Sequence, residues 1–265
     1  MTTDSYEVYA VRYAHHNRRA SENFLGGDPQ DGPMPLDYFV WAIVGATRTF
    51  VLDTGFDQAM AAKRKRDFLR SPQEGLVAIS IDPTAVEDVI ISHMHYDHAG
   101  NHDLFPKATF HVQDSEMAFC TGRSMCHPPL RRSFEEGDVA AMIRRLFEGR
   151  VQFHDGTDEL TPGVTVHHVG GHTMGLQVVR VRTRRGWVVL AADASHFYAN
   201  FEEMRAYPTV YNVADMFEGF ATLKRLATSP RHVIPGHDPL VLERYPAAKP
   251  GLPGAAVRLD ADPLE

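Results

Sequence analysis

Cysteine, net positive charge and long apolar runs are all scarce in this chain, and each scarcity excludes a class of protein. The 265 residues include only two cysteines, Cys120 and Cys126. Two are too few for a disulfide framework, and the five residues between them are not the spacing of a metal-binding pair. We therefore predict two free thiols in a reducing compartment.

Basic residues are outnumbered by acidic ones. With 27 Lys and Arg against 34 Asp and Glu, the formal net charge is -7. This balance argues against a nucleic-acid partner, because neutralising phosphates requires a basic face. The dense basic run Lys63–Arg66 is expected to be a solvated helix face.

Apolar residues are never gathered into a long run. No stretch approaches the roughly 20 apolar residues of a membrane span. Residues Met1–Tyr13 lack the basic region, apolar core and cleavage site of a secretory signal. The sequence therefore predicts a cytoplasmic protein with no membrane partner.

The composition is ordinary for a globular protein, and the pattern of residues predicts both strands and helices. Hydrophobic residues make up 43% and charged residues 23% of the chain. Strands are expected where branched and aromatic residues cluster, at residues 6–13, 38–44, 49–52, 89–92, 109–112, 164–169, 177–181, 187–191 and 232–234. Helices are expected at residues 57–69, 115–120, 138–147 and 213–227, with a short one opening at Asp82-Pro83.

Strands are followed by helices in each half of the chain. This order predicts an αββα sandwich, in which two mixed β-sheets lie between helical layers. We expect one domain over residues 1–245. The Pro-, Ala- and Gly-rich residues 246–265 are expected to form an extended or mobile tail.

Histidine is abundant, with 15 residues, and six consecutive positions form a cluster, His93-Met94-His95-Tyr96-Asp97-His98. The cluster begins where the apolar run Val89–Ser92 stops. Residues two apart on an extended strand point the same way, so His93 and His95 should aim both imidazoles into one space. Asp97 and His98 can then place a carboxylate and a third imidazole around a neighbouring position.

Three more candidate ligands each follow an apolar run, and they are His172, Asp193 and His237. Neutral imidazole and carboxylate are suitable ligands for Zn²⁺, and a catalytic site also needs an open or water-occupied position. Five His and two Asp can supply two metals.

This ordered set resembles the metallo-β-lactamase superfamily, whose pattern is His-x-His-x-Asp-His, then a lone His, a bridging Asp and a last His. The resemblance runs from about Phe39 to His237 and includes Asp53-Thr54-Gly55, which is similar to a turn after the family's early strand. It implies two Zn²⁺ ions, with Fe, Mn or Co as alternatives. The implied ligands are His93, His95 and His172 for the first metal, Asp97, His98 and His237 for the second, and Asp193 as the bridge.

A chance cluster is the alternative to a metal site. The four-residue motif alone should arise by accident in on the order of a few chains per thousand, before the later ligands are required. The remaining histidines are expected to be surface or satisfied polar residues, and they are His15, His16, His102, His111, His127, His154, His167, His168 and His232.

The chemistry expected of two divalent cations is hydrolysis. Cations flanking one water lower its pKa toward about 7, so the predicted step is attack on a carbonyl by a hydroxide that bridges the metals. We expect Asp97 to orient this hydroxide and to carry a proton as a general acid or base. Asp53 is not expected to bind a metal itself, but only to interact with a side chain that does.

Within the superfamily the chain looks most like the N-acyl homoserine lactonase group, on Asp193-Ala194-Ser195 and Gly236-His237-Asp238. The resemblance implies opening of a small lactone, a quorum-quenching activity where that lactone is an N-acyl homoserine lactone. In that group a tyrosine three residues after the bridging Asp helps to position the lactone, and here this position is His196. His196 would donate the same hydrogen bond or cap local backbone, with Tyr198 or Tyr211 as substitutes.

Other activities of the superfamily stay open. A glyoxalase-II-like thioesterase would carry a helical domain after its last ligand, and only 28 residues follow His237. A second alternative is another ester or amide hydrolase. A third is a mononuclear-iron sulfur dioxygenase, in which no second metal would be held by Asp97, His98 and His237. The expected partner is a small lactone or ester, and a homodimer remains open, with residues 117–134 as a lid or dimer contact.

Apolar side chains before and after the cluster have two interpretations. They either line an apolar substrate pocket or, as we expect for most, pack in the core, and they are Phe56, Met60, Phe68, Met117, Phe119 and Met125.

Overall fold

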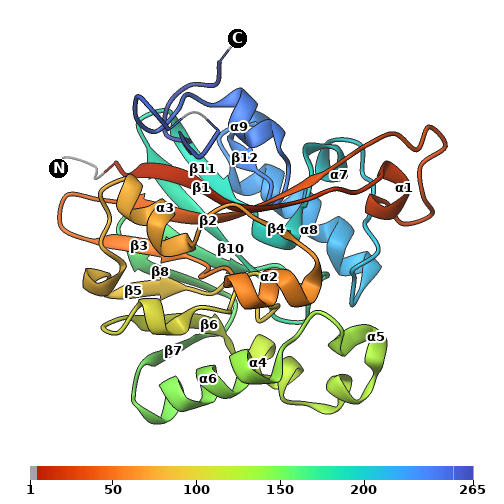
Figure 1. The fold of residues 1–265 in the computed structure, drawn as a ribbon, viewed down its shortest axis with the longest axis horizontal. Helices are drawn as coiled ribbons and strands as arrows, with labels where there is room; N and C mark the ends of the chain where they lie inside the picture. Colours follow the sequence, from red (N-terminus) through yellow and green to blue (C-terminus); the bar gives the residue numbers. More distant parts are fainter. Residues whose placement is uncertain (1–4, 253, 265) are drawn as a thin grey trace.

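The computed structural model describes residues 5–252 and 254–264, and two β-sheets form its centre (Figure 1). The first has the order β13-β1-β2-β3-β5-β6-β7, with β4 paired to β1. Its strands are β1 Glu7–His16, β2 Leu36–Val44, β3 Thr49–Leu52, β4 Asp67–Phe68, β5 Asp88–Ile90, β6 Thr109–Gln113, β7 Val151–His154 and β13 Ala256–Arg258. The second has the order β12-β11-β10-β9-β8, formed by β8 Thr157–Thr161, β9 Val164–His168, β10 Gln177–Thr183, β11 Gly186–Leu190 and β12 Val233–Ile234.

Both sheets are mixed, as the sequence predicted. The strands β3, β5, β6 and β7 run parallel, whereas β1, β2 and β3 pair antiparallel. In the second sheet only the β11–β12 pair is parallel among the described residues. The carboxyl ends of β5, β11 and β12 therefore leave the sheets as loops that are free to carry a site.

Most of the helices cover the outer faces of the sheets (Figure 1). The helices are α1 Ala20–Asn23, α2 Gln58–Arg64, α3 Pro72–Ala78, α4 Asp114–Cys120, α5 Pro128–Arg131, α6 Glu136–Phe147, α7 Tyr198–Glu202, α8 Val213–Leu226 and α9 Leu240–Arg244. One apolar cluster joins α3, α4 and α6 to the first sheet. The other fills the space between the sheets and reaches α7, α8 and α9. These layers are those of the predicted αββα sandwich.

Strand β2 contributes side chains to both hydrophobic cores. Its side chains alternate between the faces of the sheet, so Trp41 and Ile43 enter the cluster between the sheets. Val40 and Ala42 enter the cluster under the helices. A strand buried on both faces reads as a continuous apolar run, which is what residues 38–44 are.

The helix predicted at residues 57–69 was too long. α2 ends at Arg64 because Lys65 adopts the left-handed conformation, with φ 55°, and its N–H closes the last turn on Ala61 and Ala62. The chain then turns back, and Phe68 of β4 pairs with Ala14 of β1. The short helix at Asp82-Pro83 is a 3₁₀ turn over Pro83–Ala85, with Asp82 accepting a hydrogen bond from the Thr84 N–H.

The predicted C-terminal tail is wrong for residues 256–258. These form β13, which pairs antiparallel with β1 at the sheet edge. Val257 and Leu259 are fully buried in the core between the sheets. Their apolar pattern was too short to predict a strand within a stretch rich in Pro, Ala and Gly.

Two smaller expectations can be checked on the described residues. Cys120 is buried and Cys126 is exposed, and both are free thiols. No helix in the described part of the chain has the length and apolar character needed to cross a membrane.

Candidate metal centre

The seven predicted ligands converge at one edge of the sandwich, and each is at most 9% exposed. The His93–His98 loop follows β5, and His172 lies in the loop between β9 and β10. Asp193 lies in the 3₁₀ turn after β11, and His237 follows β12. The sequence placed each of them after a strand, and the two sheets bring those ends together.

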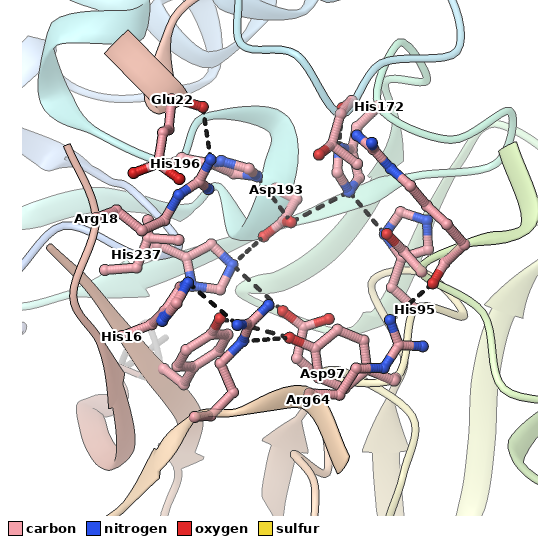
Figure 2. A pocket seen from close by; sticks show the side chains of 17 residues that line it. His16, Arg18, Glu22, Arg64, His95, Asp97, His172, Asp193, His196 and His237 are labelled. Carbon is pink, nitrogen blue, oxygen red and sulfur yellow. Dashed lines mark hydrogen bonds and ion pairs between the residues drawn. The ribbon is translucent and has the colours of Figure 1, made fainter. Parts of the chain in front are cut away.

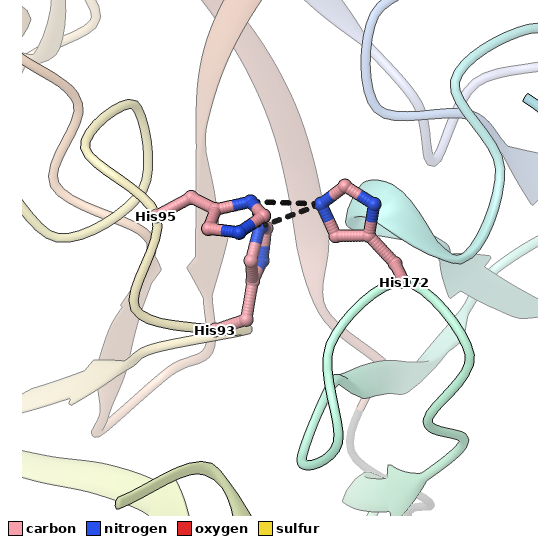
Figure 3. A group of neighbouring side chains, drawn as sticks. All are labelled: His93, His95 and His172. Atoms are coloured by element: carbon pink, nitrogen blue, oxygen red, sulfur yellow. Dashed lines mark hydrogen bonds between the residues drawn. The ribbon is translucent and has the colours of Figure 1, made fainter. Parts of the chain in front are cut away.

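Three histidines form the first group (Figure 3). The His172 Nε2 lies 2.9 Å from the His95 Nδ1 and 3.2 Å from the His93 Nε2. The His93 Nε2 and His95 Nδ1 are 3.0 Å apart. Three mutually facing ring nitrogens suit a shared cation, because tetrahedral Zn–N bonds of about 2.0–2.1 Å separate the nitrogens by roughly 3.3 Å.

A second group lies beside the first and contains Asp97, His98 and His237, whose ligand atoms all lie within 4.8 Å of one another. The Asp97 Oδ2 is 3.7 Å from the His98 Nε2 and 3.8 Å from the His237 Nε2. These spacings leave room for an ion among the three side chains.

Asp193 stands between the two groups. Its Oδ2 is 3.2 Å from the His172 Nε2, and its Oδ1 is 2.9 Å from the His237 Nε2 and 3.2 Å from the His98 Nε2. The Asp193 Oδ1 and the His98 Nε2 are buried and form no hydrogen bond within the described residues. Orphaned polar atoms of this kind are costly unless an ion or water satisfies them, so this donor set fits a divalent metal.

Contacts behind the ligands fix their ring orientations. The His98 Nδ1 lies 2.7 Å from the Asp53 Oδ2, while Asp53 also accepts hydrogen bonds from the Ser92 N–H and Oγ–H. The Nδ1 atoms of His172 and His237 donate to the Thr209 and Asp37 carbonyls, at 2.7 and 2.8 Å. Each contact can hold the ring proton on Nδ1 and turns Nε2 toward the centre, which is the arrangement that metal ligation requires.

Glu116 is a structural support that sequence reasoning missed. Its fully buried carboxylate accepts hydrogen bonds from the Met94 N–H at 2.8 Å, the Thr173 hydroxyl at 2.6 Å and the Gly175 N–H at 3.0 Å. It therefore joins the His93 loop to the His172 loop. Burial raises the pKa of Glu116, and these three donors oppose that rise. Its position in a helix with an ordinary sequence gave no signal of this role.

The electrostatics of the two groups differ. Burial, followed by the neighbouring imidazoles, lowers the pKa of His93 and His95 well below the usual value. Burial acts the same way on His98, but Asp193, Asp53 and Asp97 outweigh it and raise its pKa well above the usual value. His93 and His95 are therefore neutral and ready to ligate, whereas carboxylates surround His98.

His196 is buried beside the bridge. Its ring stacks on Tyr207 with 3.7 Å between the centroids, and its Nε2 is 3.0 Å from the Asp193 Oδ2. Burial is the main reason that its pKa is lowered to about 3. The Tyr207 hydroxyl donates to the Asp193 carbonyl.

The two tyrosines considered as substitutes for His196 do not reach the centre. Tyr198 is buried in the core between the sheets, and its hydroxyl has no hydrogen-bond partner among the described residues. Tyr211 is 42% exposed and packs against Phe119. Neither lines the cavity described next.

A cavity of about 360 Å³ opens onto the centre (Figure 2). Asp97, His95, His172, Asp193, His196 and His237 form its floor, and its walls are mostly polar. The apolar-pocket interpretation is therefore wrong for this cavity. Phe56, Met117 and Phe119 are buried in the core, and Met60, Phe68 and Met125 pack against it.

Two groups that the sequence left without a role also line the cavity. His16 does so although we expected only a surface or satisfied polar residue, and Arg64 and Arg66 do so although we expected a solvated helix face. From the segment 117–134, Arg132 and Ser133 reach the wall.

Comparison with known proteins gives a family match. Residues 34–242 match the Metallo-beta-lactamase superfamily. An N-acyl homoserine lactonase from a Bacillus species is 30% identical over 128 residues, which are 48% of this chain and 46% of the relative. The N-acyl homoserine lactonase AttM of Azorhizobium caulinodans is 29% identical over 174 residues, 61% of this chain and 62% of the relative. The matches thus span about half to three fifths of these relatives.

Solved structures share the fold. A quorum-quenching N-acyl homoserine lactone lactonase superposes with a TM-score of 0.71 at 19% identity, covering 89% of this chain and 93% of the other. A probable metal-dependent hydrolase from Staphylococcus aureus gives 0.73 at 14% identity, covering 100% and 97%. At such identities the likeness is one of fold.

Proposed function

The chain is a member of the metallo-β-lactamase superfamily, and from this premise we propose that it is a two-metal hydrolase that opens the ring of a small lactone. Zinc is the proposed metal. The observation that carries the proposal is the position of Asp193, whose two carboxylate oxygens face two separate histidine groups. The curated relatives named N-acyl homoserine lactonases support the choice of a lactone.

The proposed ligands are those that the sequence suggested. His93, His95 and His172 would hold one ion, Asp97, His98 and His237 the other, and Asp193 would touch both. When bound, two divalent cations supply hydroxide at neutral pH and polarise the substrate carbonyl. The rest of the chemistry falls to side chains around the cavity.

Asp97 is the proposed general acid and base. It lies on the cavity floor and is the most exposed of the seven ligands, at 9%. Its carboxylate can therefore meet a bound lactone and also face His98 and His237. A group in that place can accept the proton of the attacking water and return it to the leaving alkoxide.

His196 is proposed to hold Asp193 in place. Neutral imidazole has one N–H, and here the Nε2–H donates to the Asp193 Oδ2. Tyr207 fixes the ring from its other face by stacking. The sequence left two roles open for His196, a hydrogen bond to the lactone or a cap on local backbone, and we propose this contact with Asp193 in place of both.

Two measurements test the proposal. Metal analysis of the purified protein should give about two ions per chain, and His98→Ala should reduce this to about one and abolish turnover. His111→Gln removes a buried histidine that pairs with Asp88 outside the centre, and it should keep both ions. One ion in the unaltered protein together with an active His98→Ala variant would sink the two-metal mechanism.

The substrate class is tested with a panel of lactones, thioesters and aryl esters, followed by acid release. Lactones should be hydrolysed fastest. Faster thioester cleavage would support the thioesterase, and oxygen uptake with a persulfide substrate would support the sulfur dioxygenase.

A further inference from the structure

Cationic side chains surround the mouth of the metal-centre cavity. Arg18, Arg64, Arg66 and Arg132 all line it, and Figure 2 shows Arg18 and Arg64 on opposite sides of the proposed ligands. They come from three separate segments, after β1, at the end of α2 and after α5. Since the whole chain has a net charge of -7, this concentration is not a consequence of a generally basic surface.

One of the four arginines is committed to the protein itself. Arg64 pairs with Glu135, with 2.6 Å between its Nη2 and the Glu135 Oε1, and its Nη1 donates to the Arg132 carbonyl at 2.7 Å. The Arg64 guanidinium group also lies over the ring of Tyr96, and this contact further fixes its position. Arg64 is therefore a support rather than a free donor.

The other three have no carboxylate partner among the described residues at ion-pair distance. Among the described side chains, Arg66 donates to the Tyr96 hydroxyl at 3.2 Å and to the His16 Nε2 at 3.1 Å. Arg18 donates to the Glu22 backbone carbonyl at 2.5 Å. The side chain of Arg132 has no hydrogen-bond partner in the described structure, so donors of all three remain available to a ligand.

Other titratable side chains line the cavity beside these arginines. Burial, then Arg66 and Arg18, lowers the pKa of His16 to about 4, so His16 is neutral and accepts from Arg66. Asp97 and Asp193 are the acids on the cavity floor, and as proposed metal ligands they do not neutralise the arginines. Glu22 is the acid at the mouth, and its carboxylate accepts from the Arg19 N–H.

We infer that the substrate carries an anionic oxygen group, a carboxylate or a phosphate, which Arg66, Arg132 and Arg18 bind while the lactone lies over the metals. This inference rests on the proposed function and names the substrate class of that site. Guanidinium groups bind both anions through paired N–H donors. An N-acyl homoserine lactone has no such group, so this chain is expected to differ in substrate from the relatives named above.

A second, apolar cavity of about 790 Å³ shares Arg64 and Arg132 with the metal-centre cavity, and Met125, Phe134 and Ile143 are among its other lining residues. None of the proposed metal ligands lines it. A long acyl chain would need this cavity, whereas an anionic substituent would need the arginines. The two substrate types can therefore be separated by experiment.

The test compares γ-lactones of one ring size that carry a carboxylate, a phosphate, a neutral carboxamide or a long N-acyl chain. We expect kcat/KM for an anionic lactone to exceed that for the carboxamide by on the order of tenfold or more, mainly through KM, and to fall with added salt. The better of the two anions identifies the group.

Arg66→Gln and Arg132→Gln should each remove most of that preference, by lowering kcat/KM for the anionic lactones far more than for the carboxamide, and should keep two ions per chain. Arg131→Gln is the matched control, because Arg131 is exposed and lines the apolar cavity but not the metal-centre cavity. Equal rates for the charged and neutral lactones, or fastest turnover of the N-acyl lactone, would overturn the inference while leaving the lactonase proposal intact. No turnover of any lactone would overturn the proposed function itself.

Discussion

Replacing Asp53 by Asn should weaken one of the two proposed ions and leave the other bound. Asp53 is fully buried and is the hydrogen-bond partner of the His98 Nδ1. Its backbone is left-handed, with φ 63°, a conformation that Asn tolerates well. The substitution therefore changes one oxygen into an NH₂ group without straining the turn.

Either orientation of the new amide sets a donor against a donor. If its NH₂ faces His98, the ring must move its proton to Nε2 and can no longer ligate. If the NH₂ faces the Ser92 N–H instead, that buried group loses its 2.7 Å hydrogen bond. Losing a hydrogen bond to a charged group costs about 1.5–3 kcal/mol, which is roughly a 10- to 150-fold change in an equilibrium constant.

We therefore expect the second ion of Asp53→Asn to bind about 10- to 100-fold more weakly, a range typical of lost outer partners. Titration of the metal-free protein with Zn²⁺ against a chromophoric chelator would measure both affinities. Asp88→Asn is the matched control, because Asp88 is also buried and pairs with His111 at 3.0 Å, away from the centre. If Asp53→Asn binds both ions as tightly as the unaltered chain does, the role given to Asp53 is refuted.

Three further substitutions test the supports of the centre and the charges near it. Glu116→Gln should leave the Gly175 N–H or the Met94 N–H facing the new NH₂ donor, because only one side-chain oxygen remains. The melting temperature and the affinity for the first ion should both fall. If both are unchanged, Glu116 does not join the two loops as described. Gly175→Ala would place a Cβ 2.0 Å from the Glu116 backbone nitrogen, so it should lower the free energy of unfolding by about 1–3 kcal/mol, measured by denaturant titration. The control is Gly137→Ala on α6, where the added Cβ meets open space and should cost nothing. Burial, with Glu135 and Asp57, raises the pKa of Asp138 from 3.8 to about 7. Between these two pH values the folded chain keeps a proton on Asp138 that the unfolded chain has lost. The stability that this proton contributes is therefore lost as the pH rises through about 7. Asp138→Asn should therefore raise the melting temperature at pH 8 more than at pH 5.5, and equal shifts would refute this.

The proposed metal centre was predictable because its candidate ligands occur in short sequence motifs. His93 to His98 are contiguous, and each later ligand follows an apolar run that ends at a strand terminus. Strand ends of a layered α/β fold meet at one edge, so residues far apart in sequence become neighbours there. The order of the ligands and the strand positions together were enough to anticipate the convergence that the structure shows.

The supports of the centre were not predictable in the same way. Glu116 lies in α4 with no motif around it, and its role depends on which two loops it meets in space. The edge strand β13 is three residues long and lies in a segment whose composition suggested a tail. In both cases tertiary contacts decide the outcome, and a local pattern of residue types carries little information about them.

The arginines at the cavity mouth show how a small error in local structure hides a functional surface. In the predicted helix 57–69, Arg64 and Arg66 would lie about 200° apart around the axis and would point to opposite sides. The left-handed Lys65 ends α2 between them, so the chain reverses and both side chains line one cavity. One residue with positive φ thus converts an expected solvated face into the region where we propose that an anionic substrate binds. The proposed metal ligands would determine which bond breaks, and this turn, which the motifs do not encode, bears on which molecule we propose is brought to them.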